Sequence, residues 1–287
     1  MKHCLQTIFA VAFVCMAIGM TQAGIYSTGG ANTNPDAPDA AIHYSDSKFV
    51  SWVTEVIEYA PAPGVAANWQ NTSNVIGPVG SNNMAIVSLG DLNATQIADG
   101  VSPGYIVLAF LNGIGNGIGA DFAAFENAMI SGGKVFAELA YVEVSTDGVV
   151  FSRFPSISET PGQVGGMGTV DPTGVYNLVG KHTTGYGTPF DLDDLLDDEF
   201  VLAGLVDLNN INYVRLVDIP GDGTFKDSLG NSIYDAWVTT GSGGLDFAGI
   251  GVINERIATA TPEPGTLAIG GLFLLGSLVR FRREKKV

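Results

Sequence analysis

Short apolar runs separated by turn residues recur through the middle of this chain, and they restrict the fold more than any other feature. The clearest runs are residues 105–111, 121–126, 137–145, 149–154, 213–218 and 247–254. Gly, Asn or Asp bounds most of them, which is typical of β-strands. Asp147 and Gly148 separate two runs and predict a hairpin, because Gly accepts a positive φ without strain.

Other stretches are less regular. Residues 48–59 mix β-branched alternation with helical spacing, and we interpret them and residues 84–89 as strands. Residues 190–200 form the one predicted helix, with Asp191 as its N-cap. Strands joined by long loops, in a chain with 38 Gly, favour an all-β fold of the jelly-roll sandwich kind.

The first 23 residues have the layout of a secretory signal. A basic start precedes an apolar core at 8–18, and small residues lead up to Gly24. This layout predicts cleavage between Ala23 and Gly24. Both cysteines of the chain, Cys4 and Cys15, fall inside this segment. The exported chain would therefore have no disulfide, thiol nucleophile or cysteine metal ligand.

The other end of the chain also carries a membrane signal. An apolar run at 265–279 follows the turn Pro262, Glu263 and Pro264, and basic residues follow the run: Arg280, Arg282 and Arg283. The run is shorter than the about 20 residues that span a bilayer comfortably, so it needs basic residues that snorkel to the headgroups. Those residues would hold their end in the cytoplasm. An ordinary anchor that is never cut is one interpretation.

The Pro-Glu-Pro turn, the apolar run and the basic residues together resemble a PEP-CTERM sorting tail, which is the other interpretation. The resemblance implies a tail at 259–287, with its motif at 262–264, a transmembrane segment at 265–281 and a basic end at 280–287. It implies removal by an exosortase, transient anchoring in the inner membrane, and then a place at the cell surface or in the extracellular matrix. The implied partners are the exosortase, the secretion machinery and exopolysaccharide. An extracytoplasmic domain at 24–258 remains.

The charge of the chain narrows its partners. The formal net charge is −16, and the imbalance is larger in the exported part, because the basic end lies outside it. Nucleic acid and anionic membrane surfaces need clustered cations, so we exclude them as partners. The many carboxylates suit calcium, which takes oxygen ligands, although a merely solvated acidic surface explains most of them as well. We expect no organic cofactor.

Five motifs carry a second resemblance. They lie at 119–127, 136–156, 177–195, 211–223 and 244–254. Together they resemble an uncharacterised family of bacterial cell-surface proteins, whose sandwich is similar to galactose-binding-like (discoidin-type) domains. The resemblance implies that sandwich and, as one function, carbohydrate binding. Relatives tend to carry a second acid two residues after Asp246, where this chain has Ala248, and an ion site that used both acids would be weakened.

Two groups of oxygen-bearing residues are candidate calcium ligands. The loop at 218–235 contributes Asp218, Asp222, Asp227, Asn231 and Asp235, and the second group consists of Asp121, Glu126, Asn127 and Asp246. Asp121 and Glu126 would face opposite ways on an unbroken strand, so only a bulge or a loop would let them share an ion. The alternative for both groups is turn capping and solvation.

We predict that the chain is not an enzyme. Only His43 and His182 lie beyond the predicted signal, no Gly-x-Ser-x-Gly motif occurs, and nothing singles out a carboxylate pair for glycoside hydrolysis. Two functions remain ahead of a third, an enzyme that acts on glycans: a non-catalytic surface or matrix protein braced by calcium, and a sugar-binding module. The sugar-binding candidates are Tyr234, Trp237 and His182, with core packing as the alternative for aromatic residues.

Overall fold

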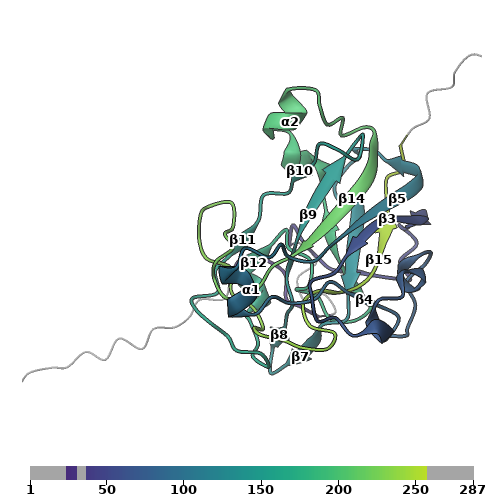
Figure 1. Cartoon of the computed structure of the whole chain (residues 1–287). Helices are drawn as coiled ribbons and strands as arrows, with labels where there is room; N and C mark the ends of the chain where they lie inside the picture. Colours follow the sequence, from purple (N-terminus) through teal and green to yellow (C-terminus); the bar gives the residue numbers. More distant parts are fainter. Residues whose placement is uncertain (1–23, 31–36, 257–287) are drawn as a thin grey trace, which may run out of the picture.

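Two antiparallel sheets form the centre of the molecule in the computed structural model, which describes residues 24–30 and 37–256 (Figure 1). The six-stranded sheet contains, in spatial order, β1 (Ile42–His43), β13 (Tyr186–Phe190), β6 (Phe122–Glu126), β15 (Asp246–Val252) and β2 (Ser51–Trp52), with β4 (Val87–Ser88) also paired to β15. The five-stranded sheet contains β10 (Ser152–Arg153), β9 (Ala140–Ser145), β14 (Ile211–Asp218), β5 (Tyr105–Ile114) and β3 (Glu55–Ala60).

Smaller elements surround these sheets. They are the pairs β7 (Met129–Ser131) with β8 (Lys134–Phe136) and β11 (Ile157–Ser158) with β12 (Val175–Tyr176), the helices α1 (Ala94–Ala98) and α2 (Glu199–Leu202), and four 3-10 turns at Ala67–Trp69, Thr72–Val75, Pro172–Gly174 and Leu192–Leu195. The prediction of a mostly β chain is confirmed.

One apolar core joins the two sheets. Leu108, Val142 and Val214 come from the five-stranded sheet, and Phe122 and Phe190 come from the six-stranded sheet. All five are buried in one contiguous cluster. Side chains alternate between the two faces of a strand, so each sheet turns one apolar face towards the other. The fold is therefore a β-sandwich.

The strand predictions hold best in the middle of the chain. The hairpin at Asp147 and Gly148 is confirmed, since β9 pairs with β10 across it and Gly148 has a φ of 77°. The ambiguous stretch 48–59 divides into β2 and β3, which belong to different sheets. The change of sheet at buried Val53 explains why this stretch fits no single period.

The predicted helix at 190–200 is wrong. The stretch contains a 3-10 turn at Leu192–Leu195 and then the short helix α2. Asp191 caps the first, as predicted, but Asp198 caps the second by accepting from the amides of Phe200 and Val201. Two N-caps so close together start two separate turns.

The described residues contain no helix that is long and apolar enough to cross a membrane. The predicted transmembrane segment 265–281, the sorting motif at Pro262, Glu263 and Pro264, and the basic residues after them lie outside the described residues. Ala23 does as well, whereas Gly24 lies within them.

Candidate functional site

Six acidic side chains gather at one end of the sandwich. Glu126 ends β6 and Asp246 begins β15, whereas Asp218 ends β14 opposite Ala140, the first residue of β9. The sheets bring these strand ends together. Connecting segments supply the other three members, so the buried acidic cluster consists of Asp91, Glu126, Glu138, Asp218, Asp235 and Asp246.

Burial and mutual repulsion both act on the cluster. Burial is the larger cause and raises the pKa of Glu126 and Glu138 well above the usual value, and the charge of Asp246 raises both further. Burial likewise raises the pKa of Asp218 and Asp235, with Asp91 as a like-charged neighbour of each. Buried carboxylates that repel one another favour the neutral acid.

The two members with smaller shifts follow the same rule. Burial raises the pKa of Asp91 to about 6, although hydrogen bonds from Thr239 oppose the shift. Burial raises the pKa of Asp246 to about 7, against hydrogen bonding from Ser242, Asn127 and Ser88. Asp91 and Asp246 therefore change charge near neutral pH.

No basic side chain pairs with the cluster within the described ranges. The three ion pairs there join Glu143 to Arg153 and Arg215, and Lys181 to Asp39. None of these five residues belongs to the cluster. Buried charge is normally paired, because desolvation of an isolated ion is costly, so the cluster departs from the usual arrangement.

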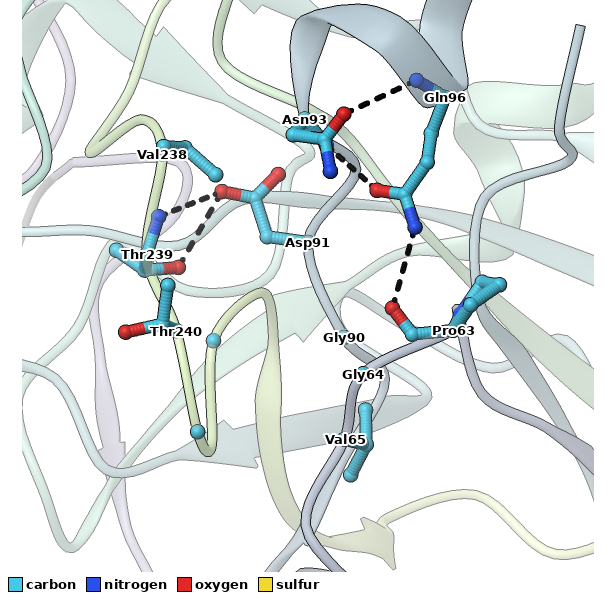
Figure 2. A pocket seen from close by; sticks show the side chains of 12 residues that line it. Pro63, Gly64, Val65, Gly90, Asp91, Asn93, Gln96, Val238, Thr239 and Thr240 are labelled. Atoms are coloured by element: carbon cyan, nitrogen blue, oxygen red, sulfur yellow. Dashed lines mark hydrogen bonds between the residues drawn. The ribbon is translucent and has the colours of Figure 1, made fainter. Parts of the chain in front are cut away.

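Several cluster carboxylates have one oxygen fixed and the other without a partner. Figure 2 shows Asp91 with one oxygen turned towards Thr239, whose amide nitrogen lies 2.8 Å from Oδ2. Asp218 Oδ1 accepts from the amide of Leu245 at 2.7 Å. The second oxygens, Asp91 Oδ1 and Asp218 Oδ2, are buried without a hydrogen-bond partner, as is Asp246 Oδ1. The backbone thus orients Asp91 and Asp218 and leaves acceptor capacity unused.

One loop, residues 238–245, crosses the cluster, and we call it the cover loop. It donates the amides of Thr239 and Leu245 to the cluster, and its Gly243 carbonyl accepts from the hydroxyl of Ser88 at 2.8 Å. Gly244 has a φ of 72°, and a Cβ there would lie 2.7 Å from Asp218 Oδ1. Glycine is required at this position because of this φ and because a Cβ would collide with the Gly90 backbone and with Asp218.

Two cavities flank the cover loop. A smaller one of about 230 Å³ includes Asp91 in its wall (Figure 2), and a larger one of about 610 Å³ includes Glu138 and Asp246. Thr239 lines both. Two aromatic residues, Trp69 and Phe136, also line the larger cavity. The cluster therefore lies next to solvent on two sides of one loop.

The structure divides the predicted calcium loop at 218–235. Its two ends, Asp218 and Asp235, join the cluster, and Asp235 Oδ2 accepts from the amide of Leu139 at 2.6 Å. The middle of the loop has turn roles instead. Asp222 accepts from the amide of Thr224, and Asp227 accepts from the amides of Leu229 and Asn231. Asp222 and Asp227 therefore take part in turns, as the alternative of turn capping expects.

The second predicted group also divides. Glu126 and Asp246 enter the cluster, and Asn127 lies against Asp246. Asp121 lies at the other end of β6, where its carboxylate accepts from the amides of Gly117 and Leu192 and from Asn254. Asp121 and Glu126 are therefore not brought together, and Asp121 holds a loop in place.

The predicted sugar-binding residues are not assembled into one pocket. His182 is buried, between the hydroxyls of Ser27 and Thr188, with no surface for a ligand. Burial lowers the pKa of His182 well below its usual value, and Lys181 lowers it further. Trp237 donates its indole N–H to the Leu92 carbonyl, and the ring of Tyr234 covers Gly223. Both aromatic residues have packing roles.

Sequence reasoning missed two members of the cluster, Asp91 and Glu138. Asp91 follows a very short strand and Glu138 precedes β9, and each lies alone in the sequence. Neither residue carries a local pattern that would have identified it. Among the described residues, no three His, Cys, Asp or Glu side chains are arranged to hold a metal ion on their own.

Comparison with known proteins adds no assignment. No protein-family model matches the chain, and no curated protein matches it either.

Proposed function

We propose that this chain is an exported, non-catalytic surface or extracellular-matrix protein that an exosortase processes at its C-terminal tail. The observation that supports this most is the position of the fold between the two predicted processing points. The amide of Gly24, the first residue after the predicted signal cleavage, donates to Thr173 Oγ1 at 2.8 Å. Tyr26 then donates its amide to the carbonyl of Thr173.

The C-terminal side of the domain supports the same proposal. Glu255 forms an isolated bridge with Ile114, and Arg256 donates to Asn212 Oδ1 at 3.1 Å. Pro262 follows six residues after Arg256. Cleavage at the motif would leave every described strand in place. We further propose that the sandwich is of the jelly-roll, galactose-binding-like kind, and that the released domain joins the exopolysaccharide layer.

Mass spectrometry of the chain produced in an exosortase-containing host tests this proposal. We expect an N-terminus at Gly24 and a C-terminus near Pro262–Pro264, with the product outside the cell. In a host that lacks the exosortase, the tail should remain and the protein should stay with the membrane. The matched variant replaces Arg280, Arg282 and Arg283 by Ala and should also keep the tail. An uncut tail in the exosortase-containing host would contradict the proposal.

A carbohydrate-binding module is the second candidate, and the larger cavity favours it. Trp69 and Phe136 supply a surface on which a sugar ring can stack, and Asn127 and Thr240 supply polar groups for its hydroxyls. Saturable binding to purified exopolysaccharide that Trp69→Ala abolishes would support this function. Trp237→Ala is the comparison, because Trp237 does not line this cavity. A loss of binding in Trp237→Ala alone would contradict this site.

A further inference from the structure

The buried acidic cluster presents an electrostatic problem. Its carboxylates lie in a low-dielectric setting, they repel one another, and no Lys or Arg of the described ranges pairs with them. A buried charge of this kind is neutralised either by a proton or by a cation. Six carboxylates from separate segments converge on one end of the sandwich, and a single cation would relieve several repulsions together.

The oxygens without partners form an independent observation that indicates a ligand. Asp218 is 1% exposed and Asp246 is 5% exposed, and each has a buried carboxylate oxygen without a hydrogen-bond donor. In residues 24–30 and 37–256, five buried side-chain oxygens have no hydrogen-bond partner. Three of them are carboxylate oxygens of the cluster. Unused acceptors on buried acids are uncommon in proteins and call for an explanation.

The mutual influence of the carboxylates shows where their charges converge. Asp246 raises the pKa of both Glu138 and Asp218, and Asp218 also raises the pKa of Glu138. These three side chains come from the start of β15, the segment before β9 and the end of β14. No three acidic side chains of the described residues are placed to share one ion, so the convergence is narrower than the cluster as a whole. Asp218 and Asp246, which carry the unpartnered oxygens, are the pair that offers a small cation the most favourable place.

We propose that the buried acidic cluster binds one calcium ion, with the unpartnered oxygens of Asp218 and Asp246 as its carboxylate ligands. All the available ligands are oxygens, which excludes the nitrogen and sulfur ligands that zinc prefers. No third acidic side chain of the described residues is placed to share the ion, so its other ligands have to be neutral oxygens. Calcium tolerates irregular sets of six to eight oxygens and accepts hydroxyl, amide, backbone and water oxygens, whereas magnesium requires a regular octahedron.

The cover loop and two residues outside it, Asn127 and Ser88, offer such additional oxygens. The side chains of Ser242, Asn127 and Ser88 lie against Asp246, and Thr239 lies against Glu138. Bound calcium would therefore fix the cover loop across the end of the sandwich. The proposal goes beyond export and processing, since it concerns the domain alone.

Thermal unfolding of the full chain in detergent micelles, in calcium and in EGTA, tests the site. Ligand at about 100 times its Kd should raise the Tm by about 5–10 °C for a domain of this size. Asp218→Asn and Asp246→Asn should lose most of this rise. Asp222→Asn and Asp227→Asn are the matched controls and should keep it, because these residues have turn roles. Magnesium at the same concentration should give a smaller rise.

A second measurement keeps the test valid if a cluster variant fails to fold. Terbium, a luminescent substitute for calcium, should bind the unaltered chain and be displaced by calcium. No calcium-dependent rise in Tm together with no displaceable terbium would overturn the proposal. It would also be overturned if the Asp222 and Asp227 variants lost the rise and the Asp218 and Asp246 variants kept it.

Discussion

Two buried regions of this domain treat their carboxylates in opposite ways. Asp39 is fully buried and paired with the ammonium of Lys181, which also donates to the carbonyl of Val175. The acidic cluster contains five buried acids and the half-buried Asp91, without a basic partner in the described ranges. Burial lowers the pKa of Lys181, but the charge of Asp39 opposes this shift. A buried acid is thus neutralised by a side chain in one region and requires a proton or an ion in the other.

The contrast separates structural acids from candidate ligand acids. Buried Asp39 has both oxygens engaged, one by Ser27 and the other by Lys181. In the cluster, Asp91, Asp218 and Asp246 each keep one buried oxygen free. A count of acidic residues would not distinguish the two kinds. The unused buried oxygens of Asp91, Asp218 and Asp246 do distinguish these three acids from Asp39.

The largest expected effect comes from breaking the paired region. Lys181→Met leaves Asp39 buried without its cation and should lower the free energy of unfolding by about 3–5 kcal/mol. Urea unfolding measures this loss, which should be the same in calcium and in EGTA. Exposed Lys134→Met is the control and should change stability by less than about 0.5 kcal/mol. An equally small change for Lys181→Met would show that the pair contributes nothing.

The second-largest effect should be the pH dependence of the free energy of unfolding, which the acidic cluster without a basic partner should produce. In EGTA, the raised pKa of Asp246, about 7, means that the folded state keeps a proton which the unfolded state releases near pH 4. Stability from this group is complete below about pH 4 and is lost as pH rises to about 7, by about 2–4 kcal/mol. Urea unfolding across this range measures the loss.

A variant isolates this contribution. Buried His182 acts in the opposite direction, since its lowered pKa costs stability as pH falls below about 6.5. The difference between the unaltered chain and Asp246→Asn cancels that effect. A difference that does not change between pH 4 and pH 7 would show that Asp246 is not held as a neutral acid.

A smaller effect should come from the acids that cap turns. Asp227 accepts from the amides of Leu229, Asn231 and Ser158. Asp227→Ala should therefore cost about 1–2 kcal/mol, as the loss of a capping side chain usually does. The cost should be equal in calcium and in EGTA, and exposed Asp197→Ala should cost almost nothing. A calcium-dependent cost would return Asp227 to the candidate ligands.

The sequence predicted the fold better than the site. Apolar alternation in β5, β9 and β14 is a local property, so these strands were recognisable before their partners were known. The cluster depends on strand ends that meet only after the sheets form. Asp218 and Asp246 were identified as separate candidates, whereas Glu138 and Asp91 have no local pattern. The burial of His182 depends on Ser27 and Thr188, and Ser27 is far away in the sequence.

The smallest effect that we predict is also the sharpest, because its sign differs between the two regions. Asp218→Asn at pH 7.5 in EGTA should stabilise the domain by about 1 kcal/mol, since it removes a repelled carboxylate and its amide oxygen can still accept from Leu245. The same substitution at Asp39 should destabilise the domain, because Lys181 loses its ion pair. Calcium should reverse the first sign and leave the second unchanged. If both variants were destabilised equally in EGTA, the two regions would not differ in the way that their contacts indicate.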